Sequence, residues 1–258
     1  MNTADIRQAA HWAGLATPSI VLRALDGRDG TGLRLDDRRS LYPASMIKTP
    51  LAAAAFSLVE RGTLHLDQRI TVAQSNMTTN DKPSPFVFGY EGPLSQYLEF
   101  MITRSDNVAT NQLFDVVGRE RATDIAHELG LNSTAFHRKL SGSEPLIVDP
   151  HTTGRNTHPA ADAALLFELI ATDAIPFASQ LREILARQEW NEKLSTALRS
   201  GDRFAHKTGD TDEVSHDGGL LDTHEGPSYI IVVYTGLPSS PENDRRFGAF
   251  MRAIRPLL

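Results

Sequence analysis

The hydrophobic pattern of this 258-residue chain changes its period twice. Short apolar runs typical of strands occur only toward the two ends, at residues 19–25, 31–35, 204–207, 218–221 and 228–234. The stretch between these two groups shows instead the apolar spacing and terminal glycines of helices. The simplest arrangement that buries both groups of strands is one antiparallel sheet, interrupted in the sequence by an inserted helical block.

The two ends of the chain add a helix each. The first helix is amphipathic and ends at Gly14, and Ser240 begins a final helix with an apolar face. These helices are expected to cover one face of the sheet. We therefore predict a two-lobed α+β fold in a single domain, with residues 1–48 and 200–258 in the sheet lobe and 49–199 in an all-helical lobe.

Within the helical block, the pattern predicts helices at 46–61, 93–117, 119–129, 159–171 and 176–198. Residues 139–158 have no period and are rich in Ser, Gly, Pro, Thr and His. An irregular segment of this length in a compact domain is usually functional. We therefore expect this loop to contribute to the active site.

Composition excludes several classes of function. Lys and Arg number 26 and Asp and Glu 32, so the net charge is −6, which argues against a nucleic-acid partner. The absence of cysteine excludes disulfides, thiolate metal sites and a cysteine nucleophile. A hydroxyl is then the most plausible covalent nucleophile.

No apolar run reaches the roughly 18–20 residues that cross a bilayer, so no membrane partner is expected. The first 14 residues lack the apolar core of a secretory signal, which predicts a cytoplasmic protein as written, or a periplasmic or secreted one if a leader has been removed. The histidines at 137, 151 and 158 have no metal-ligand spacing. We expect a monomer that binds a small-molecule substrate, with no metal and no cofactor.

The first of three short motifs pairs Ser45 with Lys48, three residues later at the start of a predicted helix. A serine hydroxyl becomes a nucleophile when a base takes its proton, and a lysine is such a base if burial lowers its pKa. The backbone N–H groups of the helix N-terminus favour developing negative charge. Alone, the pattern fits equally a capping serine beside a surface lysine.

The second motif is Ser105-Asp106-Asn107, at a predicted helix end. A second hydroxyl can relay a proton between Lys48 and a leaving group, and the Asn107 amide can bind Lys48 or a substrate amide. Asp106 is expected to face away as a cap. Helix capping by all three residues is the alternative explanation.

The third motif is Lys207-Thr208-Gly209, in a predicted strand. Lys207 would supply positive charge, Thr208 would bind a substrate carboxylate, and Gly209 would allow close approach. The next backbone N–H, that of Asp210, would pair with the N–H of Ser45 as an oxyanion hole. An ordinary edge strand with an exposed lysine is the alternative explanation.

Each motif is weak alone, but the three in this order resemble those of class A β-lactamases and penicillin-binding proteins. The resemblance extends to the runs at 62–67, 107–111, 156–159 and 216–219. It implies catalytic roles for Ser45 as the acylated nucleophile, Lys48 as its proton partner, Ser105 as the relay and Lys207 as the cation beside them. It implies substrate binding by Asn107, Thr208, Gly209, Asp210 and His216. For His216, a structural or solvated histidine is the alternative explanation.

The chain departs from the class A pattern in the long loop. Class A enzymes carry a glutamate there that activates the water for deacylation. The matching register places Leu140 near that position, and Glu144, the candidate general base, falls three or four residues later. Val148 stands where the accompanying asparagine is expected.

The sequence therefore predicts a serine hydrolase that acts through a Ser45 acyl-enzyme on β-lactams or related amides and esters, with weak deacylation. A D-Ala-D-Ala-type peptidase or an esterase is the first alternative. A penicillin-binding-like protein without catalysis is the second, and the intact pair of Ser45 and Lys48 argues against it.

Overall fold

The computed structural model describes residues 2–27, 32–142 and 145–258. Its centre is a five-stranded antiparallel sheet with the strand order β2-β1-β7-β6-β5. The strands are β1 (Ser19–Ala24), β2 (Leu33–Leu35), β5 (Arg203–Asp210), β6 (Ser215–Asp222) and β7 (Ser228–Thr235). The pairing of β1 with β7, with Val21 opposite Val232, joins the two ends of the sequence in one sheet, as the pattern predicts.

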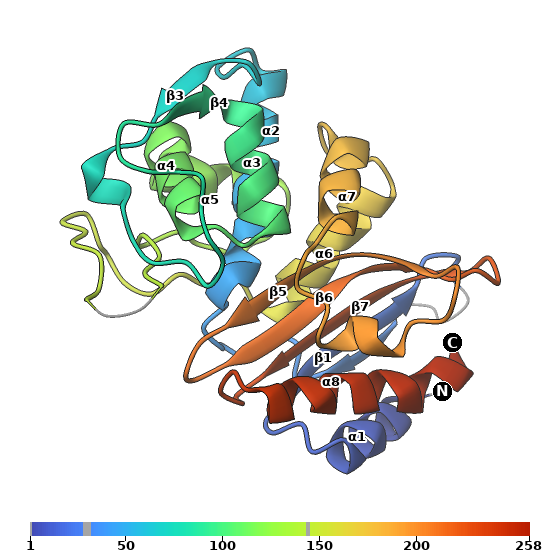
Figure 1. Cartoon of the computed structure of the whole chain (residues 1–258). Coiled ribbons are helices and arrows are strands. Elements are labelled where there is room, and N and C mark those ends of the chain that lie inside the picture. Colours follow the sequence, from blue (N-terminus) through green and yellow to red (C-terminus); the bar gives the residue numbers. More distant parts are fainter. Residues whose placement is uncertain (1, 28–31, 143–144) are drawn as a thin grey trace.

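Helices α1 (Thr3–Trp12) and α8 (Pro241–Ile254) cover one face of this sheet (Figure 1). The side chain of Asn2 caps α1, and that of Ser240 caps α8. Ile6 and Phe247 are completely buried in the core between these helices and the sheet. The amphipathic faces of the terminal helices therefore explain their position.

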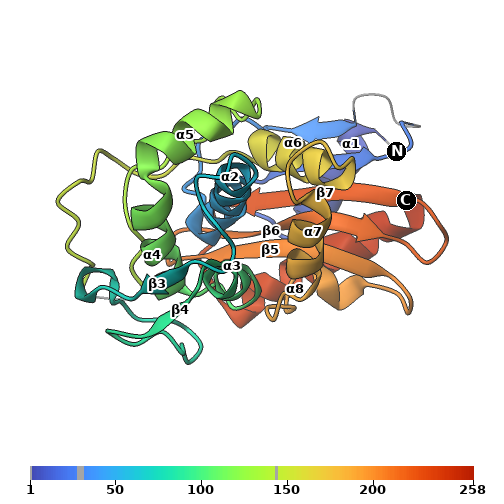
Figure 2. The same cartoon turned by 90° about the horizontal axis from the view of Figure 1, so that it is seen from above.

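The inserted block lies on the other face of the sheet. It contains α2 (Lys48–Glu60), α3 (Leu94–Thr103), α4 (Asn107–Val117), α5 (Arg119–Glu128), α6 (Ala160–Ala171) and α7 (Ala178–Ala186). Helix α2 is buried among α3, α4 and α5 (Figure 2), which its alanine-rich sequence permits because small side chains let neighbouring helices approach. Helix α6 packs on β1, β6 and β7 and connects the helical block to the sheet.

The mixed α/β fold with an antiparallel sheet is confirmed, but two details differ from the sequence-based expectation. The inserted block also holds a two-stranded ribbon of β3 (Arg69–Thr71) and β4 (Glu91–Pro93). The expected helix at 176–198 ends at Ala186, and only a short 3-10 helix, η3 (Leu194–Ala197), follows. Side chains of the intervening segment bind backbone elsewhere instead: the Gln188 amide donates to the Ile102 carbonyl oxygen at 3.0 Å, and the Trp190 indole to that of Arg104 at 3.0 Å.

The remaining elements are short. They are the 3-10 helices η1 (Ala44–Ile47), η2 (Gln74–Asn76) and η4 (Arg255–Leu257). Part of the turn predicted between β1 and β2, at 28–31, lies outside the described residues. Within the described ranges, no helix combines the length and the apolar character needed to span a membrane.

Candidate active site

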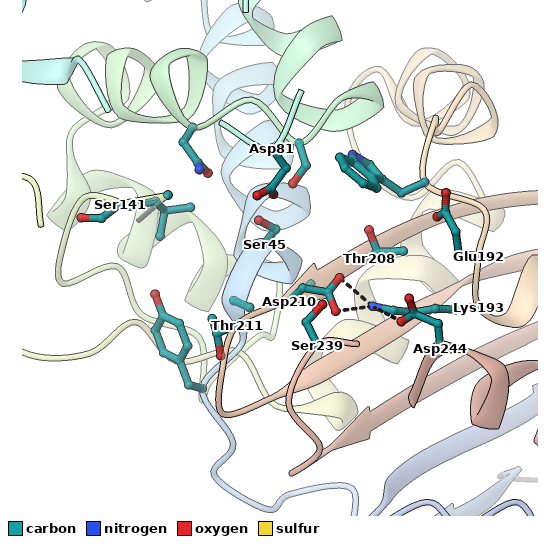
Figure 3. A pocket seen from close by; sticks show the side chains of 18 residues that line it. Ser45, Asp81, Ser141, Glu192, Lys193, Thr208, Asp210, Thr211, Ser239 and Asp244 are labelled. Carbon is teal, nitrogen blue, oxygen red and sulfur yellow. Dashed lines mark hydrogen bonds and ion pairs between the residues drawn. The ribbon is translucent and has the colours of Figure 1, made fainter. Parts of the chain in front are cut away.

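A cavity of about 480 Å³ lies between the helical block and the edge strand β5 (Figure 3). Residues from the start of the helical block, from β5 and from the 188–193 segment meet in it. Its lining includes Tyr42, Ala44, Ser45, Asp81, Ser105, Asn107, Leu140, Ser141, Gly142, Trp190, Glu192, Lys193, Thr208, Gly209, Asp210, Thr211, Ser239 and Asp244. The three motifs, 60 and 102 residues apart in the sequence, thus converge on one cavity.

Ser45 lies in the single turn of η1 and is half-buried at the cavity wall. Side chains three residues apart nearly eclipse in a 3-10 turn, so Ser45 and Lys48 lie on one side of this segment. Ala44, just before Ser45, has the left-handed φ of +47°. Such backbone strain in a non-glycine residue costs about 1–3 kcal/mol and is concentrated at functional sites.

Lys48 is completely buried and begins α2. Its Nζ donates to the Ser105 carbonyl oxygen at 2.6 Å and to Asn107 Oδ1 at 2.8 Å. Burial lowers the pKa of Lys48 to about 7, against the opposing effect of the Asp106 and Asp81 charges. A substantial fraction of this amine is therefore neutral near pH 7, as a general base requires.

Ser105 Oγ lies between two amines, 3.1 Å from Lys48 Nζ and 3.0 Å from Lys207 Nζ. Ser105 also has a left-handed φ, of +59°, which turns its hydroxyl and its carbonyl toward the same amine. Lys207 is completely buried, and burial together with the Lys48 charge holds its pKa well below the usual range. The alternative explanation, an exposed lysine on an ordinary edge strand, is thus excluded.

The other members of the second motif have separate tasks. Asp106 caps α4 by accepting the Ala109 N–H at 2.8 Å, and it faces away from the cavity as expected. Asn107 Nδ2 donates to the Thr79 carbonyl oxygen at 3.2 Å while its Oδ1 accepts from Lys48. No hydrogen bond holds the Ser45 hydroxyl in the part of the chain that the structure describes, so it is open to the cavity.

Gly209 is the contact point between β5 and the turn that carries Ser45. A Cβ at this position would lie 2.9 Å from the Pro43 carbonyl oxygen and 3.1 Å from the Met46 backbone nitrogen. Both are backbone atoms of the η1 region and cannot move aside easily. Only glycine lets the strand pass this close to the nucleophile turn.

Asp210 follows Gly209, and its side chain forms an ion pair that no sequence motif indicated. Lys193 Nζ donates to both Asp210 carboxylate oxygens at 2.6 Å, and Ser215 Oγ donates to Oδ1 at 2.9 Å. Lys193 comes from the segment expected to be helical, and its side chain is only 4% exposed. The sequence carried no signal for this lysine because its partner lies 17 residues away on another element.

The structure does not bring His216 to the cavity, which corrects the expected substrate contact. The ring is completely buried on β6, with Nε2 2.8 Å from the Tyr42 carbonyl oxygen, and it stacks on Tyr234 at 4.1 Å between centroids. Burial lowers the pKa of His216 to about 4, so the ring is neutral at pH 7. It connects the sheet to the segment before η1 rather than facing a ligand.

Leu140 lines the cavity, and Asn111 holds its backbone. Glu144 lies outside the described residues, and Val148 is exposed. Of the loop histidines, His158 is buried beside Thr134, and burial lowers its pKa to about 3. No group of three or more His, Asp or Glu side chains is placed to hold a metal ion within 2–27, 32–142 and 145–258.

Comparison with known families decides the assignment. The sequence profile described as "Beta-lactamase enzyme family" matches residues 3–255. The chain belongs to this family. It is accordingly a β-lactamase-like serine hydrolase of the acyl-transfer type.

Individual β-lactamase relatives are distant but cover most of the chain. The extended-spectrum β-lactamase PER-1 of Pseudomonas aeruginosa is 25% identical over 81% of this chain and 71% of its own length. The β-lactamase regulatory protein BlaB of Streptomyces cacaoi is 24% identical over 90% and 88%. A solved structure of PBP-A, a leucine-to-glutamate variant in an acyl-enzyme complex with penicillin G, is 26% identical with a TM-score of 0.85 over 99% of this chain and 96% of that one.

Proposed function

We propose that Ser45 is the nucleophile and that it forms an acyl-enzyme with β-lactams or related amides and esters. The observation that supports this most directly is the buried amine of Lys48, whose pKa of about 7 leaves it partly neutral. This amine lies one turn from Ser45 and 3.1 Å from the Ser105 hydroxyl. A base and a relay therefore accompany an unobstructed serine in one cavity.

Acylation follows from these positions. Ser45 Oγ attacks the carbonyl carbon while its proton passes to the neutral amine of Lys48. The C–N or C–O bond of the substrate then breaks, and the proton reaches the leaving atom through Ser105. The backbone N–H groups of Ser45 and Asp210 are proposed to stabilise the oxyanion, while Thr208 binds a carboxylate and Asn107 an amide of the substrate.

Slow deacylation is the second part of the proposal. Leu140 lines the cavity in the loop where class A enzymes carry their general base, and an alkyl side chain cannot activate water. The solved acyl-enzyme complex of a PBP-A variant with penicillin G supports acylation by β-lactams in a protein of this fold. On this proposal the chain behaves as a penicillin-binding or peptidase- or esterase-like hydrolase rather than an efficient antibiotic-destroying enzyme.

The test is intact-mass analysis during incubation with the chromogenic cephalosporin nitrocefin. A stable adduct on Ser45 with turnover slower than about one per minute is expected. Ser45→Ala should abolish the adduct without unfolding the protein, since Ser45 is only half-buried. The absence of any adduct, together with inactivity on thioester and ester substrates, would contradict covalent catalysis and favour a binding protein.

Two variants test the deacylation proposal. Leu140→Glu places a carboxylate at the cavity wall and should shorten the lifetime of the adduct by at least tenfold. Glu144→Gln should leave the wild-type lifetime unchanged. Fast wild-type turnover that Glu144→Gln abolishes would instead identify Glu144 as the general base of a working β-lactamase.

A D-Ala-D-Ala peptide or ester is the alternative substrate, with the same acyl-enzyme on Ser45. Release of D-alanine from an acyl-D-Ala-D-Ala peptide, or of D-lactate from the corresponding depsipeptide, distinguishes this activity from β-lactam trapping. We further propose that the protein acts as a monomer, and that its two lobes form one folding unit, since both contribute lining residues to the cavity. Light scattering during gel filtration tests this.

A further inference from the structure

The wall of the active-site cavity carries an unusual charge for an enzyme that takes anionic β-lactams. Four carboxylate side chains line it, against one ammonium group: Asp81, Glu192, Asp210, Asp244 and Lys193. No arginine is among the lining residues that the structure describes. Lys48 and Lys207 are completely buried beneath the cavity rather than part of its wall.

Lys193, the one cation among the described lining residues, already forms an ion pair with a carboxylate. Both oxygens of Asp210 accept from Lys193 Nζ at 2.6 Å, and the His216 carbonyl oxygen accepts at 3.1 Å, so its three donors are occupied. Asp244 Oδ1 lies 4.0 Å from the same nitrogen, beyond hydrogen-bond distance. The Lys193 ammonium group is therefore not available to bind a substrate carboxylate.

Asp244 is at the 4.0 Å limit of an ion pair with Lys193, which already binds Asp210. Two carboxylates of the wall, Asp81 and Glu192, have no ion pair within the described residues. Asp244 Oδ1 is buried without a hydrogen-bond partner within the described residues, and burial raises the pKa of its carboxyl group against the opposing charge of Lys193, with Asp210 and Glu192 adding to the rise. Glu192 is exposed, lies on the same side of the cavity as Thr208 and Lys193 (Figure 3), and forms no ion pair within the described residues. This side of the cavity therefore has an excess of negative charge.

The segment that carries Glu192 and Lys193 is fixed in place. The Leu194 N–H donates to Asp217 Oδ2 at 3.0 Å, and Asp217 Oδ1 lies 2.7 Å from His206 Nδ1. His206 and Asp217 are both buried on the sheet. The backbone beside Glu192 and Lys193 is thus fixed to the sheet, which keeps the Glu192 side chain near the cavity.

This inference rests on the function proposed above. We propose that the cavity selects acyl donors that carry a cationic group on the side that faces Thr208. Thr208 is the proposed partner of the β-lactam carboxylate. In a cephalosporin the C3 substituent is attached next to the carbon that bears this carboxylate, so it lies on the same side as Thr208. A cation at C3 would meet Glu192 and Asp244 and would offset the repulsion between the wall and the carboxylate.

Cephaloridine and cephalothin provide a matched pair of probes. They share the same acyl side chain, and they differ at C3, where cephaloridine carries a pyridinium and cephalothin a neutral acetoxy group. The experiment measures the second-order rate constant of Ser45 acylation for each by intact-mass time courses. We expect cephaloridine to react at least tenfold faster at 20 mM NaCl, and the ratio to fall at least threefold at 500 mM NaCl, where screening is stronger.

Charge-neutralising variants locate the effect. Glu192→Gln, at an exposed position with little risk to folding, should lower the rate ratio at least threefold, and Asp244→Asn should lower it as well. Asp124→Asn, which removes an exposed carboxylate of α5 outside the cavity, is the matched control and should leave the ratio unchanged.

The outcomes separate this inference from the proposed function. Equal acylation by both drugs, or a ratio that Glu192→Gln does not change, overturns the cation selectivity while the acyl-enzyme proposal stands. Failure of both drugs to label Ser45 contradicts the acyl-enzyme proposal itself.

Discussion

The Asn111 side-chain amide holds the Leu140 backbone at both of its polar atoms: Oδ1 accepts the Leu140 N–H at 2.8 Å, and Nδ2 donates to the Leu140 carbonyl oxygen at 2.8 Å. Asn111 lies on α4 and is completely buried. A helix of the inserted block therefore fixes the loop residue that occupies the cavity wall. Buried N–H and C=O groups of an irregular segment need hydrogen-bond partners, and here a side chain supplies both.

Asn111→Ala should release this loop. Two buried backbone groups lose their partners, which should lower the free energy of unfolding by about 2–4 kcal/mol. Urea unfolding measures this loss, and limited proteolysis should cut faster within residues 139–158. Asn132→Ala, at an exposed position, is the control and should change neither. Unchanged proteolysis in Asn111→Ala would show that other contacts hold the loop.

Gly209→Ala should separate β5 from the nucleophile turn. The added Cβ meets the Pro43 carbonyl oxygen at 2.9 Å, so the strand or η1 must shift. We expect a loss of about 1–3 kcal/mol of stability and at least a tenfold slower acylation of Ser45. Gly154→Ala, whose Cβ would have no neighbour closer than 3.8 Å, is the control. Acylation at the wild-type rate in Gly209→Ala would contradict a tight fit between strand and turn.

The rate of acylation should depend on pH through Lys48. Its pKa of about 7 means that the neutral base is lost as the pH falls below 7. The rate should therefore drop about tenfold per pH unit below 7 and level off above it. Stopped-flow nitrocefin kinetics from pH 5.5 to 9 measure the profile, and Lys48→Arg should remove the inflection and reduce the rate at least 100-fold. A flat wild-type profile would exclude Lys48 as the base.

Acid should destabilise the fold through the buried histidines. Burial lowers the pKa of His216 to about 4, below the value of about 6.5 in the unfolded chain, so the unfolded state binds the proton first as the pH falls. This contribution is fully present above pH 6.5 and is lost as the pH falls through 4, by about 3 kcal/mol. His158 adds to the effect in the same direction.

Urea unfolding of wild type and His216→Asn at pH 7.5, 5.5 and 4.5 tests this directly. The variant should be less stable at pH 7.5, because it loses the buried ring and its stacking on Tyr234. The difference between the two proteins should shrink on acidification, since only the wild type has a ring that stays neutral in the fold while the unfolded chain binds a proton there. A difference that is constant with pH would mean that His216 does not titrate in the expected range.

The sequence was sufficient for the architecture because hydrophobic period is a local property. The runs at 19–25 and 228–234 predict strands wherever they lie, and the pairing of β1 with β7 joins them as expected. The helix predicted through residue 198 failed, because Gln188 and Trp190 bind backbone at the end of α3. Tertiary hydrogen bonds overrode the local preference there.

The three motifs could likewise be identified from the sequence, because residue types and their order define them. Their chemistry was not: the environment of Lys48 depends on burial under α3 and α4, and the position of Ser105 between two amines depends on β5. Gly209 could be picked out from the sequence as part of the third motif. The reason that only glycine fits there is the backbone of Pro43, which lies 166 positions earlier in the sequence.

The ion pair of Lys193 with Asp210 and the acidic cavity wall belong wholly to the tertiary structure. Their side chains come from separate segments, of which only that of Asp210 adjoins a motif, and the charge of a cavity is the sum over all side chains that the fold brings to it. Sequence by itself determined the elements, the nucleophile candidate and the family resemblance, because each depends on local pattern. Folding alone decided pKa, cavity charge and loop position, because burial and distance exist only in three dimensions.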